Sequence, residues 1–142
     1  MNILFDTNVV LDVLLEREPF ASEAALLLSK VERSEISGLL SATTVTTIHY
    51  LIARALGPGE AGRHIQSLLS LFMIAPVNRA VLEQALAATF RDFEDAVLHA
   101  AAHHAGAQAI VTRNIRDFSK ATMPVFMPAE LISALDVLGS KE

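Results

Sequence analysis

The chain has 142 residues, of which 52% are hydrophobic, and a formal net charge of −5. A chain of this length and apolar content is expected to form one domain, residues 1–142, around a single core. The negative charge argues against a protein that wraps duplex DNA, and the absence of cysteine excludes disulfides and thiolate zinc sites. No apolar run reaches the roughly 20 residues of a membrane helix, and the N-terminus lacks the features of a signal peptide. We therefore expect a soluble, cytoplasmic protein.

Short apolar runs alternate with longer amphipathic segments along the chain. The runs predict strands at residues 3–5, 37–41, 72–77, 109–112 and 125–127, the last at a sheet edge. Helical spacing of apolar residues predicts helices at 9–15, 20–31, 42–56, 60–69, 78–90, 93–105 and 128–138. Thr7 and Asn8 are candidate caps of the first helix, and Asn78 is a candidate cap of the fifth. This order predicts an α/β fold with a mostly parallel sheet of four or five strands and helices on both faces.

Acidic residues occur at three places where a parallel sheet keeps its ligands. Asp6 comes directly after the first predicted strand, and Asp117 follows the fourth. Asp95 lies in the first turn of a predicted helix, three residues after Asp92. Because parallel strands end at one edge of the sheet, we expect Asp6, Asp95 and Asp117 to converge there. Three carboxylates repel one another unless a cation binds between them, and a site of oxygen ligands selects Mg²⁺ or Mn²⁺.

Three segments, in this order, make the chain resemble the PIN-domain family, which includes many small Mg²⁺-dependent ribonucleases and the VapC-type toxins of bacterial toxin–antitoxin pairs. The segments are residues 5–8 (Phe-Asp-Thr-Asn), residues 92–96 (Asp-Phe-Glu-Asp-Ala) and residues 111–118, which begin Val-Thr-Arg-Asn and end Asp-Phe. The resemblance implies that Asp6, Asp95 and Asp117 bind the metal and are catalytic. The polar residues that it implies brace them are Thr7, Asn8, Thr112 and Asn114.

The resemblance also implies an activity and partners. The expected reaction is Mg²⁺- or Mn²⁺-dependent hydrolysis of RNA phosphodiester bonds by the toxin of a type II toxin–antitoxin pair. The implied partners are an RNA substrate, a small antitoxin protein and a second copy of the chain. Arg113, Arg116 and Lys120 lie beside the third acidic segment and are candidates for contacts with flanking phosphates.

One position departs from the family pattern. PIN domains usually carry a glutamate on the helix after the second strand, and the residue that aligns with it here is Thr47. No acidic residue occurs between Glu35 and Glu60. A threonine hydroxyl can orient a water but brings no charge, so we expect weaker metal binding. A PIN-fold protein with weakened catalysis, acting as an RNA- or protein-binding module, is therefore the alternative function.

Simpler explanations exist for several of these residues. Asp6, Asp95 and Asp117 can cap or complement helices and turns, and Arg113, Arg116 and Lys120 can belong to a solvated surface. Asp12 is expected to be a solvated or helix-face residue rather than a ligand. His99 and His103 share a helix face, but the zinc-protease pattern around them is missing. A receiver-like regulator would need an aspartate after the third strand, and residues 77–79 contain none.

Overall fold

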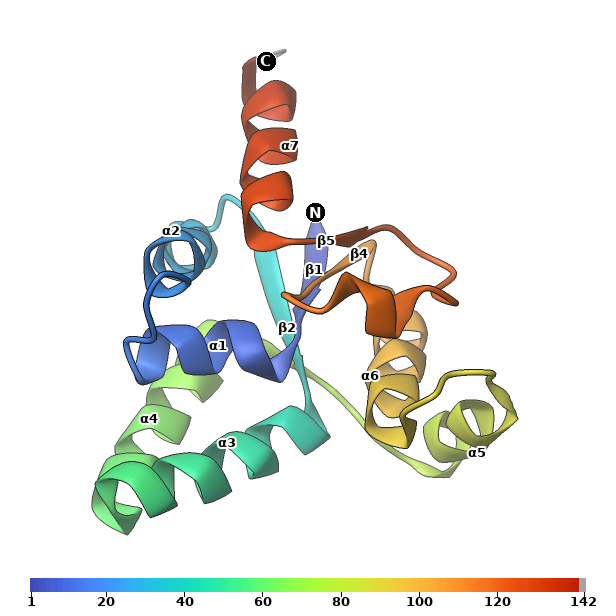
Figure 1. Ribbon diagram of the computed structural model, residues 1–142, viewed down its shortest axis with the longest axis horizontal. Helices are drawn as coiled ribbons and strands as arrows, with labels where there is room; N and C mark the ends of the chain where they lie inside the picture. The colour runs from blue at the N-terminus through green and yellow to red at the C-terminus, as the bar shows by residue number, and fades with distance from the viewer. Residues whose placement is uncertain (141–142) are drawn as a thin grey trace.

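The centre of the molecule is a parallel sheet of five strands in the order β3-β2-β1-β4-β5. The computed structural model, shown in Figure 1, describes residues 1–140. The strands are β1 (Asn2–Phe5), β2 (Ser37–Ser41), β3 (Met73–Ala75), β4 (Ala109–Val111) and β5 (Val125–Phe126). The first strand of the chain is thus the middle strand of the sheet, paired with β2 on one side and β4 on the other. The predicted fold class is confirmed.

Alternate residues of each central strand enter two separate cores, because successive side chains of a strand point to opposite faces. Ile3 and Phe5 belong to one core and Leu4 to the other, and all three side chains are fully buried. The helices that supply the first core are α1 (Thr7–Leu14), α2 (Ala21–Glu32), α3 (Ala42–Leu56), α4 (Pro58–Leu71) and α7 (Pro128–Ser140). The second core is supplied by α5 (Arg79–Ala87), α6 (Phe93–His104) and the short 3-10 helix η1 (Ile115–Phe118). Figure 1 shows α1 to α4 on one side of the sheet and α5 with α6 on the other.

The element boundaries differ from the expected ones in ways that local chemistry explains. The first helix begins at Thr7 and is capped by Asp6, so the predicted caps Thr7 and Asn8 are its first two residues. The fourth helix begins at Pro58 rather than at residue 60, because proline is well suited to the first helical position. The third strand ends at Ala75 because Pro76 has no N–H for the sheet. The expected cap Asn78 is confirmed, with its side chain accepting a hydrogen bond from the backbone N–H of Val81.

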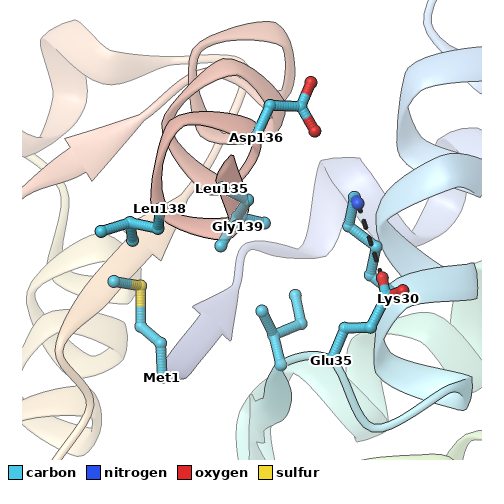
Figure 2. Close-up of a pocket in the computed structure, with 8 residues that line it drawn as sticks. Met1, Lys30, Glu35, Leu135, Asp136, Leu138 and Gly139 are labelled. Carbon is cyan, nitrogen blue, oxygen red and sulfur yellow. Dashed lines mark hydrogen bonds and ion pairs between the residues drawn. The ribbon is translucent and has the colours of Figure 1, made fainter. Parts of the chain in front are cut away.

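The amino edge of the sheet carries a cavity of about 590 Å³ that does not gather the predicted acids. Figure 2 shows it beside α7, with the Lys30–Glu35 ion pair on one side and Leu135 and Leu138 on the other. It lies at the opposite end of β1 from Asp6. Across residues 1–140, no helix is both long and apolar enough to span a bilayer.

Candidate metal centre

Asp6 is held in one orientation at the carboxyl end of the central strand. Its side chain is only 8% exposed, and its Oδ1 accepts a 2.7 Å hydrogen bond from the backbone N–H of Thr7. The Thr112 hydroxyl donates to Oδ2 at 2.7 Å, and the side-chain amide of Asn8 donates to the same oxygen at 3.4 Å. Asp6 therefore caps α1 and also faces the end of β4, so the capping explanation is correct but incomplete.

Asp95 reaches the same region from the start of α6, on the other face of the sheet. The backbone N–H of Asp95 donates to the side chain of Asp92, which caps the helix and leaves the Asp95 carboxylate free of that task. Partial burial and then the negative charge of Asp6 raise the pKa of Asp95 to about 7. Weaker repulsions from Asp92, Asp117 and Glu94 are part of this shift. The carboxyl group of Asp95 therefore favours its neutral form, because it is partly buried and its neighbours are negatively charged.

Burial also raises the pKa of Asp6 above its usual value. The hydrogen bonds from Thr112 and Thr7 oppose this effect and stabilise the carboxylate. Asp117 raises the pKa of Asp6, whereas Arg113 lowers it. Asp6, Asp95 and Asp117 are therefore within electrostatic range of one another, as expected for acids at one edge of the sheet.

A cavity of about 290 Å³ brings two of the three predicted acids together. Both Asp6 and Asp95 line it, and so does Thr47, the residue aligned with the missing glutamate. The remaining lining residues are Thr7, Asn8, Leu11, Arg17, Glu94, Leu98, Arg113 and Asn114. Side chains from α1, α3, α6 and the segment after β4 thus share one opening at the carboxyl edge. Thr112 does not line the cavity, but it is fully buried and its hydroxyl donates a hydrogen bond to Asp6.

Asp117 lies outside this cavity lining. It sits on η1 and is exposed, as are Arg116 and Lys120, and Lys120 lines a different cavity beside His99. Within residues 1–140, no three His, Cys, Asp or Glu side chains are arranged so that they could hold a metal ion. Convergence of all three acids on one ion therefore stays a prediction. What the structure brings together is Asp6 and Asp95.

The donor atoms present still suit a hard divalent cation. Mg²⁺ commonly takes one or two protein carboxylates and completes its shell with waters and substrate phosphate. Asp6 and Asp95 provide two carboxylates, Glu94 lies beside them, and the Thr47 hydroxyl lines the same cavity. Burial and the neighbouring carboxylates raise the pKa of Asp95, and a bound cation would stabilise its charged form. The set therefore fits Mg²⁺ or Mn²⁺, with one charge fewer than a glutamate at position 47 would give.

A buried ion cluster next to the cavity was missed by the sequence analysis. Asp12 lies on α1, as one of the two expected alternatives had it, but it is only 1% exposed and therefore not solvated. Its carboxylate accepts hydrogen bonds from Arg17 and from Arg113, with a shortest distance of 2.6 Å to Arg113 Nε. The sequence feature that could have indicated this cluster is that Asp12 is a lone acid among apolar residues on a short helix. Arg113 also donates its backbone N–H to the Asn8 side chain at 3.4 Å, so this cluster joins the segment after β4 to α1.

His99 has a structural role that leaves no room for a zinc ligand at its Nε2. It is 6% exposed, and its Nε2 accepts the backbone N–H of Thr122 at 3.0 Å. The ring of Phe90 lies against it, with centroids 5.1 Å apart. His99 therefore anchors the segment between η1 and β5 to α6.

Comparison with known proteins gives one family and a consistent set of structures. A family model described as the PIN domain matches residues 2–116. No curated protein sequence matches the chain significantly. FitAcB from Neisseria gonorrhoeae is 24% identical with a TM-score of 0.68, covering 89% of this chain and 98% of that one. A toxin–antitoxin complex from Klebsiella pneumoniae has the same identity and TM-score and covers 89% and 97% of the two chains.

A third structure is that of VapC20 from Mycobacterium tuberculosis, described as a toxin that cleaves the sarcin–ricin loop. It is 19% identical, with a TM-score of 0.62 over 76% of this chain and 86% of that one. These likenesses establish a shared fold, and the family match covers most of the sequence. The chain belongs to the PIN domain family.

Proposed function

We propose that the protein is a Mg²⁺- or Mn²⁺-dependent endoribonuclease and the toxin of a type II toxin–antitoxin pair. One observation carries the proposal. Asp6, which caps α1, and Asp95, in the first turn of α6, line one cavity from opposite faces of the sheet, and neither forms a hydrogen bond or ion pair with a basic side chain in residues 1–140. The toxins among the structural relatives, including one described as cleaving the sarcin–ricin loop, support it.

The proposed roles follow from the contacts of each side chain. Asp6 and Asp95 hold the cation, Asp117 completes its surroundings from η1, and Thr112 with Asn8 keeps Asp6 oriented. Asn114 lines the cavity and is available to orient substrate. A divalent cation held by Asp6 and Asp95 would lower the pKa of a water and neutralise charge on the phosphate. The reaction is hydrolysis, in which water adds to phosphorus and one ribose oxygen leaves.

The test is cleavage of single-stranded RNA by the purified protein with Mn²⁺ or Mg²⁺, compared with Asp6→Asn and Asp95→Asn. We expect each substitution to reduce cleavage at least about a hundredfold, since each removes a charged ligand. Glu83→Gln, an exposed acid on α5, is the matched control and should cleave normally. Equal cleavage by Asp6→Asn and the unaltered protein would refute the metal role.

A binding module with weakened catalysis is the second candidate, and Thr47 favours it. This side chain lines the cavity where the family pattern has a glutamate. Thr47→Glu should tighten Mn²⁺ binding in calorimetry and raise cleavage if the enzyme is weakened by the missing charge. Thr46→Glu places the same charge on the exposed neighbour and serves as control. No gain from Thr47→Glu over Thr46→Glu would show that the aligned position is not part of the ion site.

Partners form part of the same proposal. The chain is proposed to bind a small antitoxin, as the toxin–antitoxin complexes among its relatives suggest, to form a homodimer and to act in the cytoplasm. Light scattering on the purified chain, alone and co-expressed with a candidate antitoxin, tests both assemblies. A monomer at micromolar concentration would contradict the homodimer.

A further inference from the structure

The cavity that holds Asp6 and Asp95 has a second wall of opposite charge. Arg17 lines it from the segment between α1 and α2, and Arg113 from the segment after β4. Neither arginine contacts the acids of the cavity through a hydrogen bond or ion pair in residues 1–140. Negative and positive groups therefore face one opening without neutralising each other directly.

The positive wall carries an excess of one charge. Both guanidinium groups bind the same buried carboxylate: Arg17 Nε lies 2.9 Å from Asp12 Oδ1, and Arg113 Nε lies 2.6 Å from Oδ2. Arg113 Nη2 donates to Oδ1 at 3.2 Å as a second contact. Two guanidinium groups and one carboxylate sum to +1. Arg113 lowers the pKa of Asp6, so this extra charge faces the acids across the cavity without a direct ion pair.

Arg17 is the member that presents this charge. The Arg113 side chain is 23% exposed, and its guanidinium carbon lies 3.9 Å from the centre of the Phe20 ring, which covers it. The Arg17 side chain is 38% exposed, and only its Nε and Nη2 are engaged, the latter with the backbone oxygen of Asn8 at 3.3 Å. Arg17 Nη1 donates no hydrogen bond within residues 1–140. A fixed guanidinium with a free donor edge suits a phosphate oxygen.

We propose that Arg17 binds a backbone phosphate of single-stranded RNA next to the linkage held at Asp6 and Asp95. The inference rests on the proposed function and adds a phosphate-binding residue to it. Asp12 and Arg113 are positioning residues, which hold Arg17 and the segment after β4 in place. Of the bases that the sequence suggested, Arg116 and Lys120 do not line the cavity, and Arg113 is turned toward Asp12.

The test is fluorescence anisotropy of a labelled single-stranded RNA, measured in EDTA and in Ca²⁺ over a series of salt concentrations. We expect Arg17→Gln to weaken binding about tenfold and to reduce the slope of log K against log salt by about 0.7, the value for one phosphate contact on a single strand. Arg33→Gln removes one positive charge at the far end of α2, where Arg33 pairs with Glu35, and should leave both values unchanged. Arg116→Gln tests in the same assay whether the base on η1, which does not line the cavity, contributes to RNA binding.

Folding and function are controlled separately. Thermal unfolding checks that Arg17→Gln is folded, and Arg17→Lys should retain the salt slope because its charge is kept. If Arg17→Gln does not fold, the side-chain N–H signals of Arg17 in the ¹⁵N-labelled unaltered protein should shift on addition of RNA. Equal effects of Arg17→Gln and Arg33→Gln, unmoved Arg17 signals, or no RNA binding at all would overturn the inference. Cleavage is not part of this readout, so a loss of cleavage together with normal, Arg17-dependent RNA binding would overturn the ribonuclease proposal and leave this inference standing.

Discussion

The hydroxyl of Thr112 donates a 2.7 Å hydrogen bond to Asp6, 106 positions earlier in the chain, and both side chains are buried. The bond lowers the pKa of Asp6 against the effect of burial. It also fixes the relation between β4 and β1 at their carboxyl ends. The orientation of the central acid therefore depends on a residue from the last third of the sequence.

Replacing Thr112 by valine keeps the shape of the side chain and removes this donor. We expect the free energy of unfolding at pH 7 to fall by about 2 kcal/mol, because a buried carboxylate loses a charge-assisted hydrogen bond. Urea denaturation measures the change. Thr46→Val removes an exposed hydroxyl that bonds the backbone oxygen of Thr43, and it should change stability by less than about 0.5 kcal/mol. A loss as small as that for Thr112→Val would mean that the bond contributes little.

Asp95 should make the metal-free protein less stable as the pH rises from about 4 to about 7. Its pKa is raised from 3.8 to about 7 in the folded chain, so the folded state binds more protons than the unfolded state across this interval. The free energy of unfolding then falls with increasing pH and levels off above about 7. Denaturation in EDTA at several pH values should show a shallower decline for Asp95→Asn. Asp136→Asn, on α7, should follow the unaltered protein, and identical curves for Asp95→Asn would contradict the raised pKa.

His99 should affect the free energy of unfolding with the opposite pH dependence to Asp95, at acidic pH. Burial and the nearby His103 lower its pKa from the ordinary value of 6.5, so the unfolded state binds the proton more readily. Its contribution to stability is present above pH 6.5 and is lost as the pH falls below that value. Titration by NMR should show the His99 ring changing charge below pH 6.5. His99→Gln should remove this part of the acid destabilisation, and a titration above pH 6.5 would refute the assignment.

Asp12 should be among the most sensitive charged residues to substitution. Asp12→Asn leaves Arg17 and Arg113 without a carboxylate, and we expect a loss of about 3 kcal/mol of unfolding free energy. Glu35→Gln breaks exposed pairs with Lys30 and Arg33 and should cost less than about 1 kcal/mol. Chemical denaturation of both variants gives the comparison. Similar small losses would mean that the buried pairs only balance their own desolvation.

The strands of the sheet and the positions of Asp6 and Asp95 could be predicted from the sequence, because each depends on the order of residues within a short segment. Short apolar runs gave the strands, and the position of Asp6 after the first of them was enough to put it at the carboxyl edge. Asp95 could be predicted because it lies in the first turn of a helix. Asp92, three residues earlier, is the N-cap of the same helix.

Pairings between distant side chains could not be found in this way. Arg113 lies 101 positions from Asp12, and nothing in the local sequence distinguishes it from the exposed Arg116 three residues later. The choice between them is made by packing, because the Arg113 guanidinium stacks on Phe20 while Arg116 sits on the outer side of η1. Sequence order therefore predicted where bases gather but not which base remains available for phosphate.

The position of β1 in the middle of the sheet has a consequence during protein synthesis. This strand is made before both of its neighbours, and one of them, β4, is made only when residues 109–111 have been synthesised. Until then Asp6 lacks the Thr112 hydroxyl, and α6 has no completed sheet edge beside it. A nascent chain therefore cannot assemble the complete acidic cavity before residues 112–114 have been synthesised.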